Sequence, residues 1–238
     1  MFKTERQSKI MEMLQEKQFC SVQQLSAQLY VAPVTVRRDL AQMELAGLLR
    51  RCHGGAAIPG HQNREVPFDL RDQTNAAEKA SIGRQAAAML HEGDTVFMDA
   101  STTVSHVADF LSPDLNLTVV TNSIKILEKL KERHIRCYLT GGMLLENSYA
   151  LIGNFAEQTI SGLYADICFF STQGITRDGV ITDYSEAETR LRQVMLAHAR
   201  RRVYLFDGSK LGKQFMFRVC TVKELEDLIT DAQVSFEL

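Results

Sequence analysis

In the first part of the chain, apolar residues recur every three or four positions in three separate segments, which is the period of an amphipathic helix. The positions that form these stripes are Ile10, Met13 and Leu14, then Val22, Leu25 and Leu29, and then Val36, Leu40 and Met43. The pattern predicts a first helix over about residues 4–17, followed by two short helices separated by only a few residues.

The junctions between these segments carry signals of helix starts and turns. Ser21-Val22-Gln23-Gln24 is a capping-box sequence, in which the Ser hydroxyl and the Gln amide satisfy free N–H groups at a helix start. Tyr30-Val31-Ala32 is a tight connection, and Pro33 suits the first turn of the next helix because its missing N–H is not needed there. Two helices joined this closely predict a helix-turn-helix, and the basic segment 48–56 predicts a short β-hairpin wing.

The third segment has the chemistry of a DNA-reading helix. Arg38 points almost directly away from the apolar face, with Thr35 and Arg37 on the flanks, which suits insertion into the major groove. Periodicity alone also fits a solvated basic helix, but the preceding helix and the following wing favour DNA. Asp39, near the edge of the buried face, is predicted to hold an arginine or a backbone group.

The residues that we predict to contact DNA are Ser21, Val34, Thr35, Arg37, Arg38, Arg50, Arg51 and His53. For His53, a purely structural place in the wing is an equal alternative. Thr35, Arg37 and Arg38 are expected to contact DNA from the third helix. The two wing arginines are expected on phosphates, with the minor groove as an alternative for Arg51.

From residue 78 onward, segments with helical periodicity alternate with short apolar runs typical of strands buried on both faces. The expected strands are 95–99, 117–121, 136–140, 167–171 and 203–207, with helices between most of them and one helix over about 75–91 before the first. Such alternation predicts an α/β domain with a mainly parallel sheet, in which ligands bind beyond the carboxyl ends of the strands.

The residues that follow these strands are small, hydroxylated or flexible, with an acid and a lysine among them. Ser101 to Thr103 open a helix and could hold a phosphate, Asp99 would accept hydrogen bonds from sugar hydroxyls, and Lys210 supplies a positive charge. Loops use Gly, Ser, Asn and Asp for conformational reasons alone, so a single loop is ambiguous. The same bias at every strand end favours a binding site.

Composition divides the chain into two domains. Residues 58–77 combine prolines, a glycine and charged side chains, so we predict a DNA-binding domain over 1–57, a linker over 58–77 and an effector-binding and oligomerisation domain over 78–238. The net charge of −2 hides an asymmetry, because residues 1–60 carry eight Lys or Arg against five acids. The basic residues are concentrated where phosphate contacts would need them.

Several classes of protein are excluded by composition. Apolar residues make up 45% of the chain without any run long enough to span a membrane, and the charged N-terminal segment does not resemble a secretory signal. We therefore expect a cytoplasmic protein with no membrane partner. The five cysteines are scattered without a Cys-x-x-Cys pair and the six histidines have no ligand spacing, so we expect reduced thiols, no metal and no cofactor.

These residues also resemble a known family. The segments Ala32-x-x-Thr35-Val36-Arg37-Arg38-Asp39-Leu40 and Arg51-x-His53-Gly54-Gly55-Ala56 resemble the DNA-binding half of the DeoR family of bacterial transcriptional regulators. Asp99-x-x-Thr102-Thr103, Gly141-Gly142 and Asp207-x-Ser209-Lys210 resemble its effector domain. Ala32 departs from the Ser that the family usually has, and Ser101 stands where many members have Gly.

The resemblance implies a winged helix-turn-helix domain followed by an α/β domain similar to ribose-5-phosphate isomerase. It implies a repressor of a carbohydrate operon whose affinity for operator DNA is set by a phosphorylated sugar. It also implies a dimer or tetramer, since one short helix reads too few base pairs. The expected effector-binding residues are Asp99, Ser101, Thr102, Thr103, Thr121, Asn122, Gly141, Gly142, Gln173, Glu186 and Lys210, and the resemblance carries over Glu186 and Glu188 less securely than the rest.

An isomerase-like enzyme fused to a DNA-binding module is the alternative. Asp99 and Lys210, with Glu186 or Glu188, could do acid–base work on a sugar phosphate. The two glutamates lie two positions apart and would not share a helix face. A fused DNA-binding module also favours sensing over turnover, so we expect no catalytic residues.

Overall fold

The structure, a computed structural model, describes residues 2–17, 19–52, 54–57, 66–234 and 236. The chain forms two compact units, Met1–Thr74 and Asn75–Leu238. The first unit takes in a helix, α4 (Phe68–Gln73), that lies inside the stretch expected to be linker. The domain boundaries drawn from the sequence stay a prediction.

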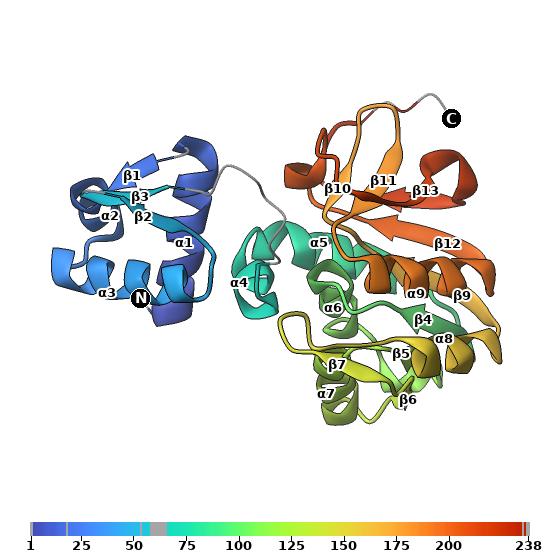
Figure 1. Cartoon of the computed structure of the whole chain (residues 1–238). Coiled ribbons are helices and arrows are strands. Elements are labelled where there is room, and N and C mark those ends of the chain that lie inside the picture. Colours follow the sequence, from blue (N-terminus) through green and yellow to red (C-terminus); the bar gives the residue numbers. More distant parts are fainter. Residues whose placement is uncertain (1, 18, 53, 58–65, 235, 237–238) are drawn as a thin grey trace. The chain divides into compact units, whose positions relative to one another are not determined.

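Helices and a small antiparallel sheet make up most of the first unit (Figure 1). The helices are α1 (Lys3–Lys17), α2 (Val22–Leu29) and α3 (Pro33–Leu45), as the apolar stripes predict. The sheet has the order β1-β3-β2 and is antiparallel, with β1 (Phe19–Ser21), β3 (Gly55–Ala57) and β2 (Arg50–Cys52). β2 and β3 form the wing, so the winged helix-turn-helix is confirmed.

The ends of α2 and α3 follow from their local sequence. The hydroxyl of Ser21 accepts a hydrogen bond from the N–H of Gln24 at 3.2 Å, and the Gln24 side chain accepts from the N–H of Ser21 at 2.9 Å. This is the expected capping box. α3 has no side-chain cap at Ala32, and Pro33 occupies its first turn. Gly55 is required in β3, because a Cβ there would lie 2.3 Å from a carbonyl oxygen of β1.

The segment after the wing packs against α1. Ser8 on α1 is buried, and its hydroxyl donates a hydrogen bond to the carbonyl of Leu70 in α4 at 3.2 Å. Leu70 and the partly buried Val66 pack with the apolar core of the first unit. This contact explains why part of the expected linker forms a helix.

A six-stranded sheet forms the centre of the second unit, with the order β14-β12-β9-β4-β5-β6. Its strands are β4 (Thr95–Met98), β5 (Thr118–Thr121), β6 (Arg136–Leu139), β9 (Ala165–Phe170), β12 (Ala199–Leu205) and β14 (Asp227–Ile229). Every pairing in it is parallel, which confirms the expected α/β class. The sequence pattern predicts all of these strands except the short edge strand β14.

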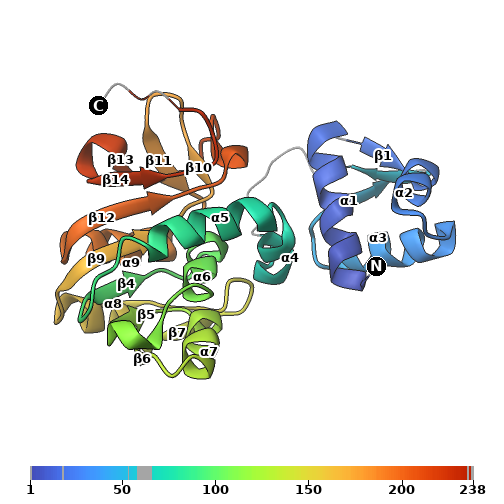
Figure 2. The same cartoon turned by 180° about the vertical axis from the view of Figure 1, so that it is seen from behind.

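Helices cover both faces of this sheet (Figures 1 and 2). They are α5 (Ala76–Ala87), α6 (Thr102–Ala108) and α7 (Ile124–Glu132) on one face, and α8 (Asn154–Ser161) and α9 (Glu186–Ala197) on the other. The arrangement buries both faces of the central strands β4, β5 and β9, which is why these strands read as largely apolar runs. The edge strand β6 is exposed on one face, at Arg136 and Tyr138.

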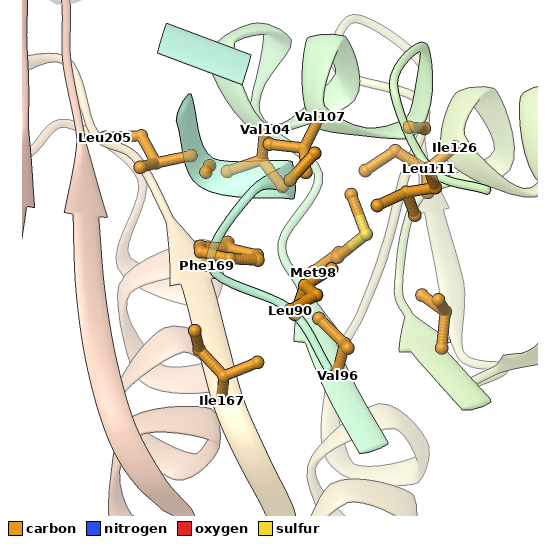
Figure 3. Packing of buried hydrophobic residues seen from close by; sticks show 14 of the residues in the cluster. Leu90, Val96, Met98, Val104, Val107, Leu111, Ile126, Ile167, Phe169 and Leu205 are labelled. Carbon is orange, nitrogen blue, oxygen red and sulfur yellow. The ribbon is translucent and has the colours of Figure 1, made fainter. Parts of the chain in front are cut away.

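Alternate residues of one strand enter different cores. Val96 and Met98 of β4 belong to the core under α5, α6 and α7, whereas Phe97 between them belongs to the core under α8 and α9. Figure 3 shows Val104 and Val107 of α6 facing Met98 across the first of these cores. This packing on both faces fixes the position of each strand. It therefore also fixes the loops that follow the strands at the carboxyl edge of the sheet.

Two smaller sheets, which the sequence pattern does not predict, complete the unit. β10 (Gly174–Ile175), β11 (Val180–Asp183) and β13 (Phe217–Thr221) form an antiparallel sheet, and β7 (Met143–Leu145) pairs with β8 (Ala150–Ile152). Single 3₁₀ turns are η1 (Pro113–Leu115), η2 (Gly208–Lys210) and η3 (Val222–Glu224).

The helix expected over 75–91 is shorter than predicted and ends at Ala87. The N–H of Met89 donates to the carbonyl of Ala86, and that of Leu90 to the carbonyl of Ala87. These tighter bonds close the helix with a 3₁₀ turn.

Candidate functional site

α3 presents a buried stripe to the core and a basic face to solvent. The apolar positions that the sequence predicts are buried, whereas Arg37 and Arg38 are exposed. At the start of the helix Val34 is 69% exposed and Thr35 is half-buried. A helix that reads the major groove needs this placement. The individual DNA contacts stay a prediction.

A buried ion pair fixes α3 against α1. Asp39 is 2% exposed, and its two oxygens accept hydrogen bonds from Nε and Nη2 of Arg6 at 2.5 and 3.1 Å. The hydrogen bond from Arg6 to Asp39 raises the pKa of Arg6, against the opposing effect of burial. The structural role predicted for Asp39 is confirmed, because its carboxylate orients the helix that carries Arg37 and Arg38.

We expect Asp39→Ala to destabilise the first unit by about 1–3 kcal/mol, because it leaves the Arg6 guanidinium largely buried without its carboxylate. Hydrogen exchange of the α1 and α3 amides in the full chain would measure the loss. Glu5→Ala is the matched control: Glu5 pairs with Lys9 at 3.4 Å with both side chains about half exposed. Such surface pairs contribute about 0–1 kcal/mol. Equal effects of the two substitutions would contradict the role given to Asp39.

The wing carries two of the predicted phosphate contacts. Arg50 and Arg51 lie on β2 and both are exposed. The N–H of Arg51 donates a hydrogen bond to Oε1 of Glu44 at 2.8 Å, so the end of α3 holds the start of the wing. His53, also predicted to contact DNA, lies outside the described residues.

The second candidate site lies at the carboxyl edge of the six-stranded sheet. From β4 the chain continues through β5 to β6 on one side, and then returns through β9 to β12 and β14 on the other side of β4. β4 and β9 are therefore the neighbours at which the winding direction reverses. In open α/β sheets, ligands bind beyond the carboxyl ends of such a pair. The residues there are Asp99 and Ser101–Thr103 after β4, and Ser171–Gln173 after β9.

Asp99 stands at the centre of this edge, and protein groups occupy its oxygens. Oδ1 accepts from the N–H and the hydroxyl of Ser101 at 3.2 and 2.6 Å. Oδ2 accepts from Nε of Arg192 at 2.5 Å and from the N–H of Ser171 at 3.4 Å. The carboxylate thus holds the start of α6 and Arg192 in place. Its hydrogen bonds to sugar hydroxyls stay a prediction.

Arg192 on α9 is surrounded by three carboxylates. Besides its bond to Asp99, Nη1 donates to Oδ2 of Asp183 at 2.8 Å, and Nη2 lies 3.7 Å from Oε1 of Glu188. All four residues are at most 5% exposed. Burial lowers the pKa of Arg192, but the charges of Asp183, Asp99 and Glu188 raise it further, so the net shift is upward. The cluster joins β4, β11 and α9 through one permanently charged guanidinium.

Buried oxygens near the switch point lack hydrogen-bond partners within the described part of the chain. They are Oγ1 of Thr103, Oδ1 of Asn122 and Oγ of Ser171. A buried polar atom without a partner costs about 1–3 kcal/mol, so it indicates a place for a ligand or an ordered water. Two of the three belong to residues predicted to bind the effector.

A small hollow opens at the same edge. Its gross volume is about 160 Å³ with open solvent included, but it has no room for a water-sized sphere, and it is lined by Asp99, Ala100, Asn122, Glu188, Leu191, Arg192 and Met195. Small-molecule pockets hold roughly 300–1,000 Å³, so the hollow is too small for a whole sugar phosphate. A larger depression, with about 320 Å³ of space for water-sized spheres, lies beside His134 and Arg136 at the amino ends of β5 and β6. That edge is opposite to the one where α/β sheets bind ligands.

Lys210 brings a positive charge to the carboxyl edge. It lies in η2, directly after β12, and its Nζ donates a hydrogen bond to the carbonyl of Thr172 beyond β9. Burial raises the pKa of Asp207, but the charge of Lys210 and the hydrogen bond from Ser209 lower it further, so its net shift is downward. Lys210 therefore reaches toward the switch point from the next strand.

Two of the other predicted effector residues, Thr121 and Gly142, have structural roles. The hydroxyl of Thr121 donates to a carbonyl of β4 at 2.7 Å. Gly142 has a φ of 115°, and a Cβ there would lie 2.5 Å from a carbonyl oxygen of β8. Glu186 is exposed in the first turn of α9, and Gln173 is half-buried after β9. Binding roles for these residues stay predictions.

The predicted effector-binding residues also extend over a greater distance than one small ligand can span. Gly141 and Gly142 follow β6, and Lys210 follows β12, four strands away in the sheet. At about 4.8 Å between neighbouring strands, these ends lie roughly 19 Å apart. The residues beside β4 and β9 are the group that the fold brings within reach of a single small ligand.

Sequence reasoning missed Arg192 and Asp183. The available signal is the spacing of Glu188 and Arg192, which places an acid and a base four positions apart on one helix face. That spacing is common on solvated helices. Among the described residues, no helix combines the length and the apolar character needed to cross a membrane.

The first unit is a winged helix-turn-helix with arginines on its recognition helix, and the second is an α/β unit with a polar switch point. Together they define a DNA-binding transcriptional regulator with a sensor domain. Comparison with protein families agrees on both units. Residues 6–62 match the DeoR-like helix-turn-helix domain, and residues 74–232 match the DeoR C terminal sensor domain. The chain belongs to the DeoR family of transcriptional regulators, as the sequence motifs predict.

Full-length relatives are regulators as well. The chain is 32% identical to the HTH-type transcriptional regulator GolR of Listeria innocua, over 99% of this chain and 93% of that protein. It is 30% identical to the glycerol-3-phosphate regulon repressor of Escherichia coli, over 98% of this chain and 92% of that protein.

Among solved structures, the chain is similar to ribose 5-phosphate isomerase A from Methanocaldococcus jannaschii. The TM-score is 0.44 with 12% sequence identity, over 58% of this chain and 55% of that one. At this level the similarity carries no argument about fold family or catalysis.

Proposed function

We propose that this regulator is a repressor of a carbohydrate operon and that a phosphorylated sugar, bound at the β4–β9 switch point, sets its affinity for operator DNA. The observation that carries the proposal is the group of buried oxygens beside this switch point that have no partner among the described residues. Lys210, which follows β12, adds a positive charge there, since its Nζ donates to the carbonyl of Thr172 after β9. The name of one relative, the glycerol-3-phosphate regulon repressor, supports a phosphorylated polyol as the ligand class.

Each part of such a ligand would have a partner at this edge. The hydroxyls of Thr102 and Thr103 and the ammonium group of Lys210 suit a phosphate, because they donate hydrogen bonds and the lysine adds charge. Oδ1 of Asn122 suits a sugar hydroxyl, since it is buried and no described residue donates a hydrogen bond to it. Arg192 is already engaged by three carboxylates, so Lys210 is the better phosphate partner.

A ligand changes DNA affinity only if the two conformations bind it differently, and the coupling is reciprocal. The test is to titrate the full chain with a panel of sugar phosphates while following thermal unfolding and binding to an operator fragment selected from random DNA. One compound should raise the melting temperature and shift the DNA dissociation constant together. Stabilisation without any change in DNA binding would count against the sensor.

We expect Lys210→Met to weaken the effector response about tenfold or more while leaving DNA binding without effector unchanged. The reason is the loss of a charge-assisted hydrogen bond to the phosphate, which contributes about 1.5–3 kcal/mol. Effector titration of the DNA complex would measure the shift in midpoint. Lys213→Met, at an exposed lysine three positions on, is the matched control. An unchanged midpoint in Lys210→Met would remove Lys210 from the site.

The isomerase alternative is less well supported by the geometry. Asp99 is bound to Arg192 and Ser101, which leaves it poorly placed to take a proton from a substrate. Glu186 is exposed. We therefore propose that the protein has no enzymatic activity, and product formation during incubation with aldose phosphates would overturn this.

We also propose that the protein binds its operator as a homo-oligomer, a dimer or a tetramer. One α3 helix contacts few base pairs, and paired half-sites multiply affinity and specificity. Sedimentation of the free protein and of its complex with operator DNA would give the stoichiometry. A monomer on a single half-site would contradict the proposal.

A further inference from the structure

The turn between α2 and α3 contains a tyrosine in an unusual conformation. Tyr30 ends α2 with φ 54° and ψ 42°, in the left-handed region. Glycine is the usual residue for such a helix end, because a Cβ approaches the following carbonyl there. The Tyr30 side chain is 94% exposed, so packing does not offset the unfavourable backbone.

The turn itself does not need the phenol ring. The N–H groups of Tyr30 and Val31 both donate hydrogen bonds to the carbonyl of Ser26, and the Ser26 hydroxyl donates to the carbonyl of Val31 at 2.5 Å. At position 30 these bonds use only the backbone, which glycine would offer equally. Folding therefore does not account for a tyrosine here, and an external partner would.

The place of Tyr30 in the fold indicates which partner. It precedes Pro33, the first residue of α3, by three positions, and the exposed Arg37 and Arg38 follow on that helix. In helix-turn-helix proteins the start of the recognition helix enters the major groove, while other contacts go to the phosphates around it. The two arginines supply the positive charge that the DNA backbone attracts.

We propose that Tyr30 contacts operator DNA, with its hydroxyl donating a hydrogen bond to a phosphate beside the bases that α3 reads. A tyrosine suits this task, since its rigid ring has few rotatable bonds and its hydroxyl lies at the tip. The proposal rests on DNA recognition through α3, and it does not depend on the identity of the effector.

Two substitutions in the full chain test the contact. Tyr30→Phe removes only the hydroxyl and should weaken specific DNA binding about tenfold. Tyr30→Gly should weaken it at least as much, while the α2 and α3 amides exchange hydrogen more slowly because the backbone strain is gone. The slope of affinity against salt should not change in Tyr30→Phe, since a neutral hydroxyl releases no counterion. Tyr164→Phe, which removes the hydroxyl of an 80% exposed tyrosine in the second unit, should change neither.

A purely structural role gives the opposite result. Tyr30→Gly would then be more stable and would bind DNA at least as tightly as the native protein, and this outcome overturns the contact. Native affinity in Tyr30→Phe overturns the hydrogen bond to phosphate. Arg38→Ala belongs in the same assay: if it loses specific binding while the Tyr30 variants keep it, only the Tyr30 proposal fails. If all three variants bind normally, α3 is not the recognition helix.

Discussion

Arg38→Ala is expected to abolish specific operator binding while the effector response of the second unit is retained. Arg38 is exposed on α3, opposite a stripe of buried residues that fixes the rotation of the helix. An arginine that pairs with a base edge contributes about 1–3 kcal/mol of discrimination, so each half-site should lose roughly 10- to 100-fold in specificity. Fluorescence anisotropy with operator and scrambled DNA, together with a footprint, measures the loss.

Arg50→Ala distinguishes base reading from phosphate binding. Arg50 is exposed on the wing strand β2, where we expect it on a phosphate. Its loss should weaken operator and scrambled DNA alike and reduce the salt slope by about one unit for each subunit bound. Arg38→Ala should instead remove the preference for the operator. An unaltered footprint with Arg38→Ala would contradict the assignment of Arg38 as the base-reading residue.

The features that sequence predicts here depend on neighbours within a few positions. The capping box of Ser21 and Gln24 is complete within four residues, and the stripe of α3 repeats within one helix. The central strands of the large sheet, such as β4 and β9, are buried on both faces, so each is a largely apolar run. Local chemistry is enough to place these elements, and strand order then brings their polar ends to one edge.

The features that sequence misses depend on distant partners. β11 pairs with β13 across a long separation, as Val180 with Thr221, and β10 has only two residues. α4 is a single short helix whose burial comes from its contact with α1. Neither case has a period long enough to recognise. The tertiary contact supplies the stability that the local sequence lacks.

Arg192 shows the same limit within the candidate site. In the sequence of α9, Arg192 looks like the basic member of an ordinary surface ion pair with Glu188. In the fold, Arg192 also binds Asp99, which lies 93 positions away after β4, and Asp183. Arg192 is therefore the centre of a buried cluster with three acids. The place of Asp99 after β4 predicts a ligand contact, whereas in the fold its carboxylate is bound to Arg192.

Arg192→Met should therefore destabilise the second unit strongly, by about 3–5 kcal/mol, because it leaves three buried carboxylates without a counter-charge. Methionine keeps much of the side-chain volume, so the loss reports charge more than packing. Urea unfolding of the full chain followed by circular dichroism, with hydrogen exchange on β4 and β11 to assign the transition, measures it. Arg190→Met is the matched control on the same helix: its Nη2 lies 3.7 Å from Oε2 of Glu157 and its side chain is 62% exposed. That exposed pair contributes about 0–1 kcal/mol.

The effect of pH on this loss of stability follows from the pKa of Arg192. The pKa of Arg192 is raised above its ordinary value, so the stability it contributes is fully present at any pH below that ordinary value and does not vary between pH 5 and 9. The deficit of Arg192→Met against the native chain should thus be measurable at pH 5 as well as at pH 8. A deficit no larger than that of Arg190→Met at either pH would mean that solvent reaches this cluster and that it is not a buried charge centre.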